Sequence, residues 1–164
     1  MSNIFLISDT HFFHQGVLHM EPVARPFSSV EEMNEALVDR WNSVVTKRDV
    51  VYHLGDVAFC SQEKLEILSR LRGIKKLILG NHDKFPNKVY EKYFTKVEAM
   101  KYFDNGILTH IPIHAQELAY RWKHNIHGHL HSKRVLIPNN EIDVRYINVS
   151  CEHNNLTPIA YEEL

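Results

Sequence analysis

Residues 3–11 read Asn-Ile-Phe-Leu-Ile-Ser-Asp-Thr-His, a short apolar run that stops abruptly at a polar motif. Apolar runs of this length, bounded by polar residues, are typical of buried strands. Because Asp9-Thr10-His11 follows the run at once, the stretch predicts a buried strand that leads into a functional loop.

The same arrangement recurs twice in the first half of the chain. Residues 49–54 form a second predicted strand, which ends at Gly55-Asp56, and residues 75–79 form a third, which ends at Gly80-Asn81-His82-Asp83. Strands that alternate with helices indicate βαβ units and a parallel sheet. The polar motifs then lie at the carboxyl ends of the strands, where open α/β sheets place their sites.

Two helices are predicted between these strands. Ser29 and Glu32 form a capping box ahead of an apolar face. Ser61 is positioned to cap the second helix, and the two faces carry Met33, Leu37, Trp41, Leu65, Leu68 and Leu71. The fold class is therefore α/β.

The second half of the chain has shorter elements. Two strands, 97–103 and 107–110, flank the turn Asp104-Asn105-Gly106 and predict a hairpin. Further short strands are expected at Ile126, 135–137 and 146–149, and Thr157-Pro158 predicts the start of a final short helix. No repeat or linker divides the sequence, so residues 1–164 are expected to form a single domain.

Composition limits the classes of partner. The formal net charge is -1 and charged residues make up 24% of the chain, so no membrane contact is expected and an extended nucleic acid is not favoured. The first residues lack the basic flank and apolar core of a secretory signal. Cys60 and Cys151 show no metal or disulfide spacing, so we expect a cytoplasmic protein with small buried cysteines.

Histidine is the unusual component. The chain contains 12 histidines, and six of them fall between residues 110 and 131. Clustered histidines without a terminal tag indicate metal ligation.

Five polar segments carry the functional argument, because each follows a predicted strand and all occur in order. They are Asp9-Thr10-His11, Gly55-Asp56, Gly80-Asn81-His82-Asp83, His110 and Gly128-His129-Leu130-His131. The last of them would place both imidazoles on one side of an extended chain. Each segment is weak alone, but together they predict a metal site.

These segments resemble the pattern D-x-H, G-D, G-N-H-[DE], H, G-H-x-H of the calcineurin-like metallophosphoesterase family, and every position is filled. The resemblance implies a two-sheet α/β/β/α sandwich with mixed sheets and helices on the outer faces. It also implies that one metal is held by Asp9, His11 and His131 and a second by Asn81, His110 and His129. Asp56 would bridge them, His82 would be catalytic, and Asp83 would orient His82.

The chemistry of these residue types agrees with the resemblance. Two divalent cations need an anionic bridge, and a hydroxide between them is a nucleophile at neutral pH. Since only two carboxylates are among the seven ligands, the centre stays positive and attracts phosphate. Nitrogen and oxygen ligands suit Mn, which we favour, and also Fe, Zn, Ni or Co.

Other polar and aromatic residues have weaker claims. His14, Arg25 and His114 could contact the substrate, with Arg25 clamping phosphate through two hydrogen bonds. His53 and His127 are expected to be packed in the core. Phe12, Phe13 and Phe27 could stack on a base but are expected to fill the core.

The sequence therefore predicts a metal-dependent phosphoesterase that acts on a small phosphate ester, in particular a phosphodiester such as a cyclic nucleotide. A phosphomonoesterase or a nuclease would use the same metals. A non-catalytic interaction module with this fold is a further alternative, but such a module should lack His82 or a ligand, and none is missing.

Overall fold

The structure is a computed structural model, and it describes residues 2–164. Its first sheet has five strands in the order β4-β3-β2-β1-β9, and its second has four in the order β5-β6-β7-β8. The first sheet comprises β1 (Ile4–Ile7), β2 (Val50–His53), β3 (Ile74–Ile78), β4 (Lys96–Glu98) and β9 (Ile159–Ala160). The second comprises β5 (Lys101–Phe103), β6 (Gly106–Leu108), β7 (Asn125–His127) and β8 (Tyr146–Asn148).

Strands β1 to β4 pair in parallel, as the βαβ pattern predicts, and β9 runs antiparallel to β1. In the second sheet, β5 and β6 form the predicted hairpin, and β6, β7 and β8 are parallel. Both sheets are therefore mixed, and helices flank them, which confirms the predicted fold class.

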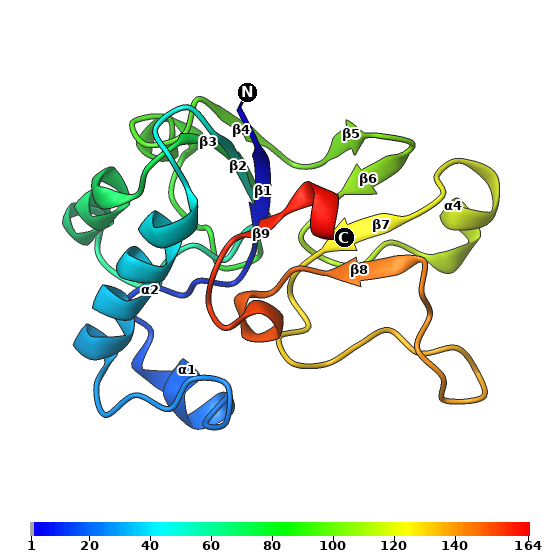
Figure 1. The fold of residues 1–164 in the computed structure, drawn as a ribbon, viewed down its shortest axis with the longest axis horizontal. Coiled ribbons are helices and arrows are strands. Elements are labelled where there is room, and N and C mark those ends of the chain that lie inside the picture. Colours follow the sequence, from blue (N-terminus) through cyan, green and yellow to red (C-terminus); the bar gives the residue numbers. More distant parts are fainter. Residues whose placement is uncertain (1) are drawn as a thin grey trace.

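Figure 1 shows α1 (Gln15–Met20) and α2 (Val30–Val44) on the side of the first sheet that faces away from the second. The 3-10 helix η1 (Gln62–Arg70) and the short α3 (Asn87–Tyr90) connect strands of the first sheet, while α4 (Ala115–Tyr120) lies beside the second sheet. Two 3-10 turns, η2 (Cys151–Asn154) and η3 (Tyr161–Glu163), follow β8 and β9.

Alternation along β1 separates two apolar clusters. Phe5 and Ile7 pack into the cluster that includes Leu37 and Trp41 of α2, whereas Leu6 packs between the sheets against Leu108 of β6 and other buried residues. Side chains of a strand point to opposite faces in turn, so one strand serves both layers. Each fully buried side chain of this size contributes about 1.5–3 kcal/mol.

The predicted capping box is confirmed at Ser29, whose hydroxyl accepts from the backbone N–H of Glu32. The carboxylate of Glu32 accepts from the backbone N–H of Ser28, one residue earlier than the motif describes. Ser61 precedes η1 without a side-chain capping bond, and this helix is of the 3-10 type.

Three predicted elements of the second half were wrong. The strand expected at 97–103 divides between β4 in the first sheet and β5 in the second. Residues 135–137 form only an isolated bridge, between Leu136 and Ile142. Thr157-Pro158 begins no helix, because the following residues pair with Phe5 and Leu6 as β9.

Candidate metal centre

The first motif loop lies against the second. Asp9 donates its backbone N–H to the carbonyl of Gly55, and His11 donates its own to the carbonyl of Asp56. Both loops leave the carboxyl ends of paired parallel strands, so they meet at one edge of the sheet. Asp9, His11, Asp56, His129 and His131 all have positive φ. Strained backbone of this kind is uncommon for these residue types and concentrates at functional sites.

The first ligand group consists of Asp9, His11 and His131, whose ligand atoms all lie within 4.8 Å of one another. Asp9 is fully buried and His11 is 2% exposed. Within residues 2–164, Oδ1 of Asp9 and Nε2 of His11 are buried without a hydrogen-bond partner. Because burying such atoms unpaired is costly, the group fits a bound cation, which would satisfy both.

The other oxygen of Asp9 is held in place. Its Oδ2 accepts from the hydroxyl of Ser150 and the backbone N–H of His129, each at 2.9 Å. Burial raises the pKa of Asp9, although nearby His110 and His131 act against this. The carboxylate is thereby oriented with only Oδ1 free.

A buried ion pair stands behind His131. Nδ1 of His131 lies 2.8 Å from Oε1 of Glu152, and the guanidinium of Arg25 contacts the same oxygen at 2.6 Å and 2.9 Å. Burial raises the pKa of Glu152, but the hydrogen bond from His131 and the charge of Arg25 bring it to about 2. The carboxylate is an acceptor, so Nδ1 carries the proton and Nε2 is left to bind a metal.

Arg25 is therefore not the phosphate clamp that the sequence suggested. Arg25 is 1% exposed, and besides contacting Glu152 its guanidinium donates to the backbone carbonyls of Asp9 and Thr10. Its charge is committed to the interior of the protein. Arg25 supports the first motif loop and cannot contact a substrate.

The second ligand group consists of Asp56, His110 and His129, again with ligand atoms within 4.8 Å of one another. Oδ2 of Asp56 lies 3.4 Å from Nε2 of His110 and 3.6 Å from Nε2 of His11. This oxygen therefore stands between the two groups, the place that a bridging carboxylate requires. Burial raises the pKa of Asp56, but the hydrogen bond and charge of His110 outweigh it, so the pKa lies below its usual value.

Asn81 joins the second group through His110. Its Oδ1 lies 3.0 Å from Nε2 of His110, whose Nδ1 lies 2.7 Å from the carbonyl of Leu54. Since a carbonyl only accepts, Nδ1 carries a proton and Nε2 points toward Asn81 and Asp56. The seven predicted ligands are thus brought together, and their assignment to metals stays a prediction.

The pair His129 and His131 divides between the groups. Strand β7 ends at His127, and the two later histidines lie in a bend (His129) and a turn (His131) rather than on an extended chain. Their positive φ values turn His129 toward His110 and His131 toward His11, with ring centroids 5.1 Å apart in each pair. The expectation that an extended chain sets both imidazoles on one side is corrected accordingly.

His82 borders both groups. Its backbone N–H donates to Oδ1 of Asp56, its Nε2 lies 4.0 Å from Oδ2 of Asp56, and its side chain is 37% exposed. A side chain that is open to solvent and beside the proposed bridge can reach a bound substrate.

Asp83 does not orient His82, contrary to the expectation. Its carboxylate accepts three backbone N–H groups, those of Asp56, Val57 and Gly80, at 2.8–3.0 Å. The Nδ1 of His82 is buried without a partner within residues 2–164. Asp83 therefore fastens the second motif loop to the third.

The remaining histidines separate clearly. His14 is half-buried, with its Nδ1 3.3 Å from Nδ1 of His11, so it lies at the centre. His114 is exposed and accepts from the backbone N–H of Gln116, so substrate contact stays a prediction for both. His53 and His127 are buried, which confirms the expectation of packed histidines. Phe12 is fully buried and Phe13 and Phe27 pack against the core, as expected for residues that fill it.

Two motif glycines allow the loops to approach. A Cβ on Gly80 would clash with Oδ1 of Asp56, and one on Gly128 would lie 2.5 Å from Oδ2 of Asp9. Each carboxylate is thus covered by a glycine from another motif. Substitution of either glycine would push a proposed ligand out of position.

Glu152 and Ser150 belong to no recognisable sequence motif, and neither was predicted to be functional. Both follow β8, so the pattern of a strand that ends in polar residues continues there. The contact of Glu152 with Arg25 joins residues 127 apart in the chain. Only the folded chain shows which acidic residue supports the site.

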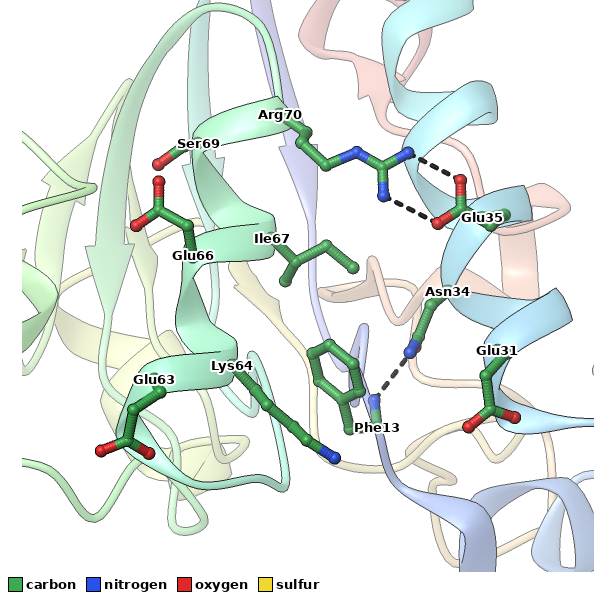
Figure 2. Close-up of a pocket in the computed structure, with 10 residues that line it drawn as sticks. All are labelled: Phe13, Glu31, Asn34, Glu35, Glu63, Lys64, Glu66, Ile67, Ser69 and Arg70. Atoms are coloured by element: carbon green, nitrogen blue, oxygen red, sulfur yellow. Dashed lines mark hydrogen bonds and ion pairs between the residues drawn. The ribbon is translucent and has the colours of Figure 1, made fainter.

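A groove of about 470 Å³ lies between α2 and η1, away from this chemistry (Figure 2). Phe13 and Ile67 are among its apolar residues, and the Arg70–Glu35 ion pair spans it. None of the seven candidate ligands lines this groove. The site is therefore the cluster of loops and not this hollow.

Comparisons with known proteins agree on the family. Residues 2–159 match the calcineurin-like phosphoesterase family. An uncharacterized protein of Methanocaldococcus jannaschii is 38% identical over 99% of this chain and 89% of its own length. The gene 66 protein of mycobacterium phage L5 is 31% identical over 83% of this chain and 81% of its own length.

A solved structure shows the same fold. The crystal structure of a protein of unknown function from Aquifex aeolicus superposes with a TM-score of 0.81 at 26% identity, covering 99% of this chain and 97% of that one. Within residues 2–164, no helix is both long and apolar enough to cross a membrane.

Proposed function

The chain belongs to the calcineurin-like phosphoesterase family, and we propose that it hydrolyses a small phosphodiester, such as a cyclic nucleotide, at a centre of two divalent metals. The observation that carries the proposal is the position of Asp56. Its Oδ2 lies within 3.6 Å of a histidine from each ligand group, so one carboxylate can serve both metals.

The donor set fits a pair of divalent cations. Asp9, His11 and His131 would hold one, Asn81, His110 and His129 the other, and Asp56 both. When bound, two such metals lower the pKa of coordinated water and offset negative charge on phosphate oxygens. The mixture of nitrogen and oxygen donors favours Mn, with Fe, Zn, Ni or Co as alternatives.

The residues around the metals supply recognition and proton transfer. Asp9 and Asp56 offset only half of the charge of two divalent cations, so the centre attracts phosphate. His82 has an exposed ring beside Asp56 and would donate a proton to the departing oxygen, an effect of about 10²–10⁴ for a general acid. His14 would contact the substrate from the first loop.

The test is hydrolysis of bis(4-nitrophenyl) phosphate compared with 4-nitrophenyl phosphate, each with Mn²⁺ and with chelator. We expect metal-dependent turnover with a higher kcat/KM for the diester. A higher kcat/KM for the monoester would assign the site to a phosphomonoesterase. If neither compound is turned over in a metal-dependent way, the proposal that the protein is a phosphoesterase is refuted.

A further inference from the structure

A small hollow adjoins the metal centre at His82. It has a volume of about 150 Å³ and is lined by Ala58, Phe59, Cys60, His82, Lys84 and Phe85. The proposed general acid therefore forms one wall of it. A group bonded to the oxygen that His82 protonates would lie at the mouth of this hollow.

The walls of the hollow are aromatic and partly open to solvent. Phe59 is 45% exposed, stacks on His14 at 4.5 Å between ring centroids and meets His82 edge-on at 5.4 Å. Phe85 is half-buried and packs against Tyr90. The exposed part of the Phe59 ring is not packed in the apolar core and borders the metal centre.

The backbone of Phe59 is hydrogen-bonded to the first motif loop. Its N–H donates to the carbonyl of Phe12 at 2.8 Å, and Ala58 pairs with Phe12 as an isolated bridge. Phe12 is fully buried beside His11, so the backbone of Phe59 belongs to the loop cluster that carries the proposed ligands, while its ring contacts His14 and His82. A preformed apolar wall loses little conformational freedom when a ligand binds.

Size and charge restrict what the hollow can hold. A cavity of about 150 Å³ accepts one benzene-sized ring. Lys84 is the charged side chain on its edge, which disfavours a cationic group such as an alkylammonium. A neutral or electron-rich planar ring satisfies both restrictions.

We propose that this hollow, the leaving-group pocket, binds a neutral planar ring carried by the alcohol that departs from phosphorus, such as a phenyl group or a pyrimidine. The inference rests on the proposed function, because it assumes that His82 faces the departing oxygen. It extends that function by naming the class of leaving group.

The test compares two phosphonates that cannot be hydrolysed, phenylphosphonate and methylphosphonate, by calorimetry on the Mn²⁺-saturated full chain. Both present the same acid group to the metals, so the ratio of their Kd values reports the ring alone. We expect phenylphosphonate to bind about tenfold more tightly, as burial of roughly half a ring predicts.

Variants of Phe59 test whether the tighter binding of phenylphosphonate arises in this pocket. Phe59→Ala should reduce the ratio to about one, while Phe59→Tyr should keep it, because the ring remains. The matched control is Tyr120→Ala, which removes an aromatic side chain that is 80% exposed on α4 and lies outside the pocket. This control should keep the wild-type ratio.

The outcomes separate the pocket from the activity. Wild-type protein that hydrolyses the diester but binds both phosphonates equally would overturn the pocket and leave the proposed function standing. A ratio that Phe59→Ala leaves unchanged would also overturn it. A phenyl preference without turnover of any phosphate ester would refute the proposed function, and with it the role of a leaving-group pocket.

Discussion

The two ligand groups differ in what stabilises them. In the first, Oδ1 of Asp9 and Nε2 of His11 are buried without a partner within residues 2–164, and a bound cation would satisfy both. In the second, Nε2 of His110 lies 3.0 Å from Oδ1 of Asn81, a hydrogen bond in which a protonated Nε2 donates to the amide oxygen. We infer that the first group binds its metal more tightly, since a metal in the second must displace an existing contact.

The supports behind the ligands differ as well. In the first group, His131 contacts Glu152, which forms a buried ion pair with Arg25. In the second group, Asp83 accepts three backbone N–H groups and positions the loop of Asp56. One group relies on a buried ion pair and the other on backbone hydrogen bonds, so they should respond to different substitutions.

The largest effect is expected at Asp56, the residue proposed to bridge the two metals. Asp56→Ala should remove both metals and abolish turnover, because Oδ2 of Asp56 stands between His11 and His110. The measurement is elemental analysis of the purified variant. His82→Ala is the matched control, and it should keep two metals while kcat falls about 10²–10⁴-fold. Retention of one tightly bound metal in Asp56→Ala would show that Asp56 serves the second group alone.

An intermediate effect is expected at the support of the first group. Glu152→Gln keeps the shape and an acceptor for His131 but removes the charge that Arg25 and His131 share. Loss of such a partner costs about 10–100-fold in metal affinity. Calorimetry with Mn²⁺ should show that the tighter of two binding steps weakens while the weaker one is unchanged. Equal weakening of both binding steps would contradict the view that the two ligand groups are supported independently of each other.

The smallest effect on metal binding is expected at the support of the second group. Asp83→Asn replaces one acceptor oxygen by an amide nitrogen, which cannot accept, and this leaves at least one buried N–H unpaired at a cost of about 1–3 kcal/mol. Thermal unfolding should show a lower Tm, and the weaker metal step should weaken further. A variant that loses the tighter step instead would reverse our assignment of Asp83.

Much of this arrangement follows from local patterns in the sequence. The strand that ends at Ile7 and the two that follow it each carry a motif at the carboxyl end, and parallel pairing of β1, β2 and β3 then brings the motifs together. The order and spacing of the motifs therefore predicted a metal site here, and the resemblance to the family named its seven ligands. The resemblance also implied how these residues divide into two groups, but not the backbone geometry behind that division, which is the positive φ at His129 and His131.

The residues that were misjudged depend on distant partners. The loop position of Arg25 suggested a phosphate clamp, but in the structure Arg25 is hydrogen-bonded in the interior to Glu152, 127 positions away in the chain. Asp83 follows His82 in sequence yet points at the backbone of Asp56 and Gly80. Residues 159 and 160 form an edge strand because their backbone pairs with the free edge of β1. Such contacts arise only once the sheets have formed.

The most direct test of the account is a titration of metal-free protein with Mn²⁺, in which heat of binding and hydrolysis of bis(4-nitrophenyl) phosphate are followed in the same samples. We predict two equivalents that bind in two steps, with turnover appearing as the second, weaker site in the Asp56, His110 and His129 group fills. Saturation at one equivalent, or turnover that survives chelation, would contradict a centre of two unequal metals.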